Sequence, residues 1–103
     1  PNPAVLGVNI REITSKTAGA LRLKNMQGVY VEYVIRGGSA FDAGLKKDDV
    51  ITEINGIPIS SVPAFQERIA RFHPGDPVAL TFIRGGKAKV FLKTTIEMVI
   101  SND

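Results

Sequence analysis

The sequence predicts a single α+β domain in which a small antiparallel β-barrel or sandwich is capped by two α-helices. Three observations favour this class. Short segments rich in β-branched and aromatic residues recur along the chain, Gly- and Asn-containing turns separate them, and only two segments have a substantial helical pattern. The length of 103 residues suits one domain, and 44% hydrophobic with 22% charged residues is typical of a globular protein.

The two ends of the chain are expected to lie outside this domain. Residues 1–4 contain two prolines and are predicted to be a linker, residues 5–97 the domain, and residues 98–103 a tail or linker. The longest apolar stretches have the length of strands, and no charged segment followed by an apolar one begins the chain. We therefore expect neither a membrane span nor a signal peptide in this segment.

The first half of the domain begins with a strand, a helix and a second strand. The first strand is expected over residues 8–13 because β-branched residues recur there. Thr14 or Ser15 can cap a short helix that continues to about Leu23. The second strand is predicted over residues 29–35, where β-branched and aromatic residues lie between glycines.

The middle of the chain predicts a brief helical turn and a strand pair. Ser39 can cap the turn, and Gly44 can end it in the left-handed conformation that glycine adopts cheaply. A strand is expected over residues 49–54. The Asn-Gly dipeptide that follows predicts a tight turn into a short returning strand over residues 57–59.

A second helix and a hairpin complete the domain. Ser60 or Ser61 can cap the helix, with a proline acceptable in its first turn. Residues 73–77 contain two prolines and a glycine and should end it. Residues 78–84 and 88–95 are then predicted to pair around a Gly-Gly turn.

Two stretches carry a family resemblance: Leu6-Gly7-Val8-Asn9-Ile10, and the block from Gly38 to Gly56 with its Ala43-Gly44-Leu45, Asp49-Val50-Ile51 and Ile54-Asn55-Gly56 segments. Together they resemble a PDZ domain of the kind attached to bacterial HtrA/DegP-like serine proteases. The resemblance covers nearly the whole chain. It implies a non-catalytic module that captures C-terminal or extended segments of unfolded protein substrates and regulates the attached protease. It also implies a place in the bacterial periplasm or cell envelope.

The resemblance implies a carboxylate-binding loop at Leu6, Gly7 and Val8. A terminal carboxylate needs several backbone N–H donors that converge on it, and a glycine lets the backbone turn closely around it. No Arg or Lys immediately precedes the loop, so we expect a modest affinity for the carboxylate. The neighbouring strand offers edge hydrogen bonds, and its Val8 and Ile10 share one face.

The opposite wall of this groove is expected on the second helix. The apolar residues Phe65, Ile69 and Phe72 recur at helical spacing, and Val62 lies on the same stripe. With Ile10 they would line a groove that prefers apolar C-terminal residues. The same spacing would also be found if this stripe were only core.

Other classes of function are disfavoured by the residues. The single histidine, His73, lies between Phe72 and Pro74 with no nucleophile pattern around it, so no catalytic residue is expected. Cysteine is absent and Asp48, Asp49 and Glu53 have no histidine partner, so we expect neither a metal site nor a cofactor. The net charge of +3 is scattered, which does not favour nucleic-acid binding.

Two alternatives stay open for the module itself. It could be a structural domain that packs on its protease domain or on neighbouring PDZ domains to build an oligomer, with the groove unused. It could also belong to another bacterial envelope protease, because PDZ domains occur in several of them.

Overall fold

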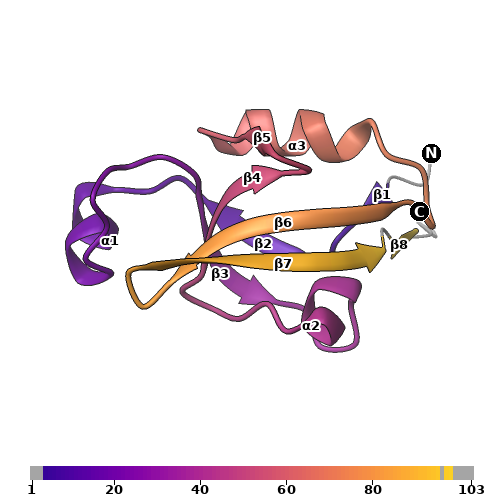
Figure 1. Ribbon diagram of the computed structural model, residues 1–103, viewed down its shortest axis with the longest axis horizontal. Helices are drawn as coiled ribbons and strands as arrows, with labels where there is room; N and C mark the ends of the chain where they lie inside the picture. Colours follow the sequence, from indigo (N-terminus) through magenta and orange to yellow (C-terminus); the bar gives the residue numbers. More distant parts are fainter. Residues whose placement is uncertain (1–3, 96, 99–103) are drawn as a thin grey trace, which may run out of the picture.

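The computed structural model describes residues 4–95, 97 and 98, which form a curved antiparallel sheet with three short helices around it (Figure 1). Along the chain the elements are β1 (Ala4–Val5), β2 (Val8–Arg11), α1 (Ser15–Ala20), β3 (Val29–Val34), α2 (Ser39–Ala43), β4 (Val50–Ile54), β5 (Ile57–Pro58), α3 (Val62–Ala70), β6 (Pro77–Arg84), β7 (Lys87–Thr95) and β8 (Glu97–Met98). The predicted α+β class is confirmed. None of the helices in these residues is long and apolar enough to cross a membrane.

The main sheet has the strand order β2-β3-β4-β6-β7, and β5 pairs with β4 beside this path. All pairings are antiparallel. In Figure 1, α3 lies along one side of the sheet near β4 and β5, and α2 lies on the opposite side near β7. This order leaves β2 as a terminal strand of the sheet, with β3 as its partner on one side.

The core is built from the inward-facing residues of the central strands and one face of α3. Val29, Val31, Val50, Ile51, Ile54 and Leu80 have no exposed surface. Phe65 and Ile69 of α3 join the same cluster, as does Leu6 from the loop between β1 and β2. Burial of this apolar surface is the main stabilising contribution to the fold.

Gly28, which immediately precedes β3, occupies a position that has no room for a side chain. Its φ angle is +109°, and a Cβ atom there would lie 2.6 Å from the carbonyl oxygen of Ile51 on the neighbouring strand. Only glycine accommodates both the backbone angle and this close approach.

Local turn and cap signals were good predictors of element boundaries. Thr14 caps α1 by accepting from the Thr17 amide at 3.1 Å, and Ser61 caps α3 by accepting from the Ala64 amide at 3.2 Å. Gly44 ends α2 with a φ of +105°. The Asn-Gly turn predicted after β4 is also confirmed.

Two helix predictions were wrong in detail. The helix expected to reach Leu23 ends at Ala20, because Arg22 adopts a φ of +57° that is incompatible with a continuing helix. Ser39 is not a cap. Gly38 occupies that position, while Ser39 lies inside α2, where its hydroxyl donates to the carbonyl oxygen of Leu6 at 3.3 Å.

The two ends of the described chain meet in the pair β1–β8. Ala4 pairs with Met98 and Val5 with Glu97. Ala4 and Met98 were assigned from sequence to the linker and the tail, but both are strand residues. The rest of these two predicted segments, residues 1–3 and 99–103, lies outside the described residues.

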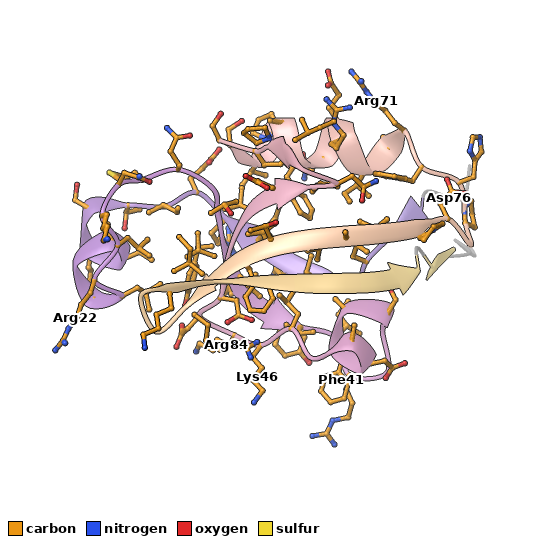
Figure 2. The ribbon with its side chains drawn as sticks, viewed as in Figure 1. Arg22, Phe41, Lys46, Arg71, Asp76 and Arg84 are labelled. Carbon is orange, nitrogen blue, oxygen red and sulfur yellow. The ribbon has the colours of Figure 1, made fainter. Side chains whose placement is uncertain are left out.

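A buried ion pair joins the start of β4 to the end of β6. The Asp49 carboxylate is 1% exposed and accepts from Arg84 Nε at 2.7 Å and Arg84 Nη2 at 2.6 Å, and from the Lys46 amide at 2.9 Å. Arg84 also donates to the Gly44 carbonyl at 3.0 Å. Its hydrogen bonds to Asp49 raise the pKa of the guanidinium above its usual value. In Figure 2, Lys46 and Arg84 lie on the same side of the molecule.

Candidate functional site

The loop between β1 and β2 is fixed by hydrogen bonds from the start of α2. Gly7 has a φ of +80°, a conformation that glycine adopts without strain. The Leu6 side chain is inserted into the core, and the Leu6 carbonyl accepts from the Ala40 amide at 3.0 Å and from the Ser39 hydroxyl. The misassigned Ser39 therefore fixes the loop that was predicted to bind a carboxylate.

The first two amides of this loop have no acceptor among the residues that the structure describes. Within the described part of the chain, the Leu6 and Gly7 N–H groups have no backbone or side-chain acceptor. The Gly7 carbonyl accepts from the Ile35 amide at 2.9 Å, next to the register pair Val8–Val34. In an antiparallel ladder this makes Val8 a non-hydrogen-bonded position, so its N–H and C=O point away from β3. Three successive residues thus have backbone donors that β3 does not occupy.

The outer edge of β2 continues this pattern along the strand. The side chains alternate, with Val8 and Ile10 partly buried against the core and Asn9 and Arg11 exposed. The register shift between Asn9 and Ile10 places its extra residue, Glu32, in β3. The alternation of β2 is therefore uninterrupted, and the backbone groups of Ile10 are expected to face outward like those of Val8.

The residues predicted on the second helix belong to, or pack against, the same core cluster as Val8 and Ile10, although Phe72 lies just beyond the end of α3. Phe65 and Ile69 are 5% and 6% exposed and belong to the central core cluster. Phe72 and Val62 are partly buried against that cluster. The structure thus brings the predicted site residues together, but Phe65 and Ile69 serve largely as core. The partly buried residues retain most of the apolar surface that a ligand could contact.

One residue of this site was missed from the sequence. The Glu12 carboxylate, just beyond the end of β2, accepts from the Val62 amide at the first position of α3, with both oxygens at 3.1 Å. This contact joins residues 50 positions apart. A glutamate after a strand has no sequence signal that would connect it to a distant helix N-terminus.

A cavity of about 440 Å³ lies elsewhere, between the segment after α1 and the β6–β7 hairpin. Its lining includes Leu21, Arg22, Lys46, Ile83 and the ion-paired Arg84. Figure 2 shows Arg22 at the end of the molecule that carries α1. None of the predicted site residues lines this cavity. We therefore take as the candidate site the outer edge of the terminal strand β2 and the adjoining residues of α3, and call this candidate groove the β2–α3 groove below.

Comparison with known sequences relates this fold to one family. The model of the PDZ domain family matches residues 4–93. The chain is 37% identical over 83 residues to the periplasmic serine endoprotease DegP of Salmonella typhimurium, which covers 81% of the chain and 18% of that protein. It is 33% identical over 98 residues to a probable periplasmic DegP-like endoprotease of Chlamydia trachomatis, which covers 95% of the chain and 20% of that protein. The chain thus spans about a fifth of the length of these relatives.

Solved structures give the same relationship. The HtrA-type protease AlgW with a decapeptide superposes with a TM-score of 0.86 at 27% identity, over 97% of this chain and 30% of that one. A PDZ domain of HtrA3 bound to a phage-derived ligand superposes with a TM-score of 0.78 over 95% of this chain and 90% of that one. At 22% identity, the second likeness concerns the fold alone.

Proposed function

The chain belongs to the PDZ domain family, and on that premise we propose that it binds peptides and thereby regulates an attached HtrA/DegP-like serine protease. Its ligands are C-terminal or extended segments of protein substrates. The protein that contains it is a serine endopeptidase of the periplasm, and this part contributes recognition rather than chemistry. The names of the matching relatives, which are periplasmic serine endoproteases, support this assignment.

The observation that carries the proposal is the outer edge of β2, which pairs with no strand among the described residues, beside loop amides that have no acceptor within them. A ligand strand adds to β2 in antiparallel orientation, and its backbone pairs with the outward groups of Val8 and Ile10. Its terminal carboxylate accepts from the amides of Leu6, Gly7 and Val8. Antiparallel addition places the C-terminus at the loop and the preceding residues toward Glu12.

The apolar lining sets the preference for the last ligand side chain. In this proposal the walls are formed by Ile10 on β2, by the small exposed parts of Phe65 and Ile69 on α3, and by the partly buried Phe72 just beyond the end of α3, so C-terminal Val, Leu or Phe is favoured. Each contact is weak. Tethering a substrate beside the protease active site still raises its local concentration, which is how a module of modest affinity can direct cleavage.

The test is a titration with paired peptides. Peptides that end in Val are measured by fluorescence anisotropy with a free or an amidated C-terminus. Loss of charge-assisted hydrogen bonds should weaken the amidated form by about tenfold or more. Equal affinities of the two forms would contradict the proposed carboxylate loop.

A glycine variant assigns the binding to the loop. Gly7→Val should abolish binding because a β-branched residue disfavours the φ of +80° and crowds the approach to the amides. Gly85→Val is the matched control, since Gly85 has a φ of +60° with open space around it in the distant β6–β7 turn. If a folded Gly7→Val variant binds as well as the parent, the ligand does not occupy this loop. If the parent binds neither peptide form, the oligomer-building alternative is favoured instead.

A further inference from the structure

We infer that Glu12 closes the β2–α3 groove at the end opposite the carboxylate loop and sets the distance between β2 and α3 there. The groove then encloses only about the last four residues of a bound chain. The inference deepens the proposed function and rests on it. It assigns Glu12 a positioning role through α3.

The contact is a bridge between the two walls of the groove. Glu12 follows the last residue of β2, and both its oxygens accept from the Val62 amide at the start of α3. Within the described residues, no other hydrogen bond joins residues 8–13 to residues 61–72. The separation of the walls at this end therefore depends on this carboxylate and on side-chain packing alone.

The N-terminus of α3 is suited to hold such a bridge. Ser61 satisfies the Ala64 amide with its hydroxyl and the Phe65 amide with its carbonyl, and Pro63 has no N–H. The remaining first-turn donor is the Val62 amide, which Glu12 uses. A carboxylate at this position also interacts favourably with the partial positive charge of the helix terminus.

Two ion pairs at β2 and at the end of α3 involve partners other than Glu12. Arg11, the preceding residue, donates its Nε to Glu32 at 3.0 Å on the exposed face of the sheet. Glu67 pairs with Arg71 at 3.0 Å on the solvent side of α3, and Arg71 points away from the sheet in Figure 2.

The position of the bridge defines the length of the groove. β2 has four residues, from Val8 beside the carboxylate loop to Arg11 beside Glu12. A ligand that runs antiparallel along β2 therefore meets the Glu12 side chain after pairing with these four positions. Ligand residues further from the C-terminus must pass over the Glu12–Val62 contact and leave the groove, so they add little to the affinity.

The experiment compares two ligands of different length. An acetylated tetrapeptide and an acetylated octapeptide share the same four C-terminal residues ending in Val, and the four additional residues are uncharged. Acetylation removes the N-terminal charge that Glu12 could otherwise attract. In the parent, we expect the two dissociation constants to agree within about threefold.

Glu12→Ala should change the length preference as well as the affinity. Loss of a helix-terminal acceptor should weaken the tetrapeptide by about threefold to tenfold. The affinity of the octapeptide should fall less, because the opened end of the groove admits its additional residues. The dissociation constant of the tetrapeptide divided by that of the octapeptide should therefore rise. A role limited to stability would not change this ratio. Glu12→Gln keeps one acceptor oxygen and should restore the ratio of the parent. Glu67→Ala, which also removes one negative charge, is the control.

The outcomes separate this inference from the proposed function. A parent that binds neither peptide overturns both, whereas a parent that binds both with an unchanged ratio in folded Glu12→Ala overturns the inference alone. NMR gives a test that is independent of peptide binding. The Val62 amide resonance should shift in Glu12→Ala and stay in place in Glu67→Ala. A Val62 amide resonance that is unchanged in Glu12→Ala also overturns the inference.

Discussion

Replacing Asp49 with alanine should strongly destabilise the domain, because it removes the acceptor of a buried ion pair. Asp49 is 1% exposed and accepts three hydrogen bonds, two from Arg84 and one from the Lys46 amide. The variant leaves the guanidinium held against the Phe82 ring, 4.9 Å from its centroid, without its anion.

The magnitude follows from burial of the two partners. Breaking a buried pair by removing one partner costs about 3–5 kcal/mol. Arg84 is 34% exposed, so water can replace part of the lost interaction, and the lower end of the range, about 3 kcal/mol, is expected. For a domain of this size, that loss lowers the melting temperature by roughly 12–24 °C.

Urea unfolding followed by circular dichroism measures this loss. The control is Glu67→Ala, which removes an exposed pair on α3 and should cost less than about 1 kcal/mol. The double variant Asp49→Ala/Arg84→Met should recover part of the stability because it leaves no unpaired charge. If Asp49→Ala unfolds within about 1 kcal/mol of the parent, the reasoning about this pair is wrong.

Two further predictions concern β3. Gly28→Ala should lower the free energy of unfolding by about 2–5 kcal/mol, because the new Cβ would meet the Ile51 carbonyl and the residue has a positive φ. Gly19→Ala in α1 is the control and should not destabilise the domain, because there is open space around Gly19. Equal urea midpoints of the two variants would contradict this prediction. The Tyr30 hydroxyl donates to Asp48 at 2.6 Å, which raises the pKa of Tyr30 to about 12 from 10.0. The folded state holds the proton more tightly, so this stabilisation is complete below pH 10 and lost as the pH rises toward about 12. Tyr30→Phe should lack this loss, and parallel pH profiles of urea stability in parent and variant would contradict it.

Local signals predicted the fold well where the structure depends on neighbours in sequence. Thr14, Ser61 and Gly44 act at helix ends within a few residues, and the chemistry of caps and turns identifies them directly. Ser39 was misassigned because its partner, the Leu6 carbonyl, lies 33 residues away. The end of α1 was misplaced because Arg22 adopts a positive φ that arginine rarely takes.

The candidate site was only partly accessible to the same reasoning. Apolar spacing indicated which side chains of α3 face inward, but it could not distinguish a groove wall from core. The structure shows that Phe65 and Ile69 are almost completely buried, whereas Phe72 keeps exposed surface. The Glu12 contact could not be predicted, because it depends on the placement of α3 relative to the end of β2.

The outer edge of β2 links the stability of the domain to its proposed function. An unpaired strand edge can recruit other chains without limit, and proteins usually shorten, charge or cover such edges. Here β2 has only four residues, carries the exposed Arg11, and ends at the Glu12 bridge to α3. An edge limited in this way can accept one short extended segment but offers little to the growth of a continuous sheet. The features that would suppress aggregation are therefore the same ones that would define a ligand of limited length.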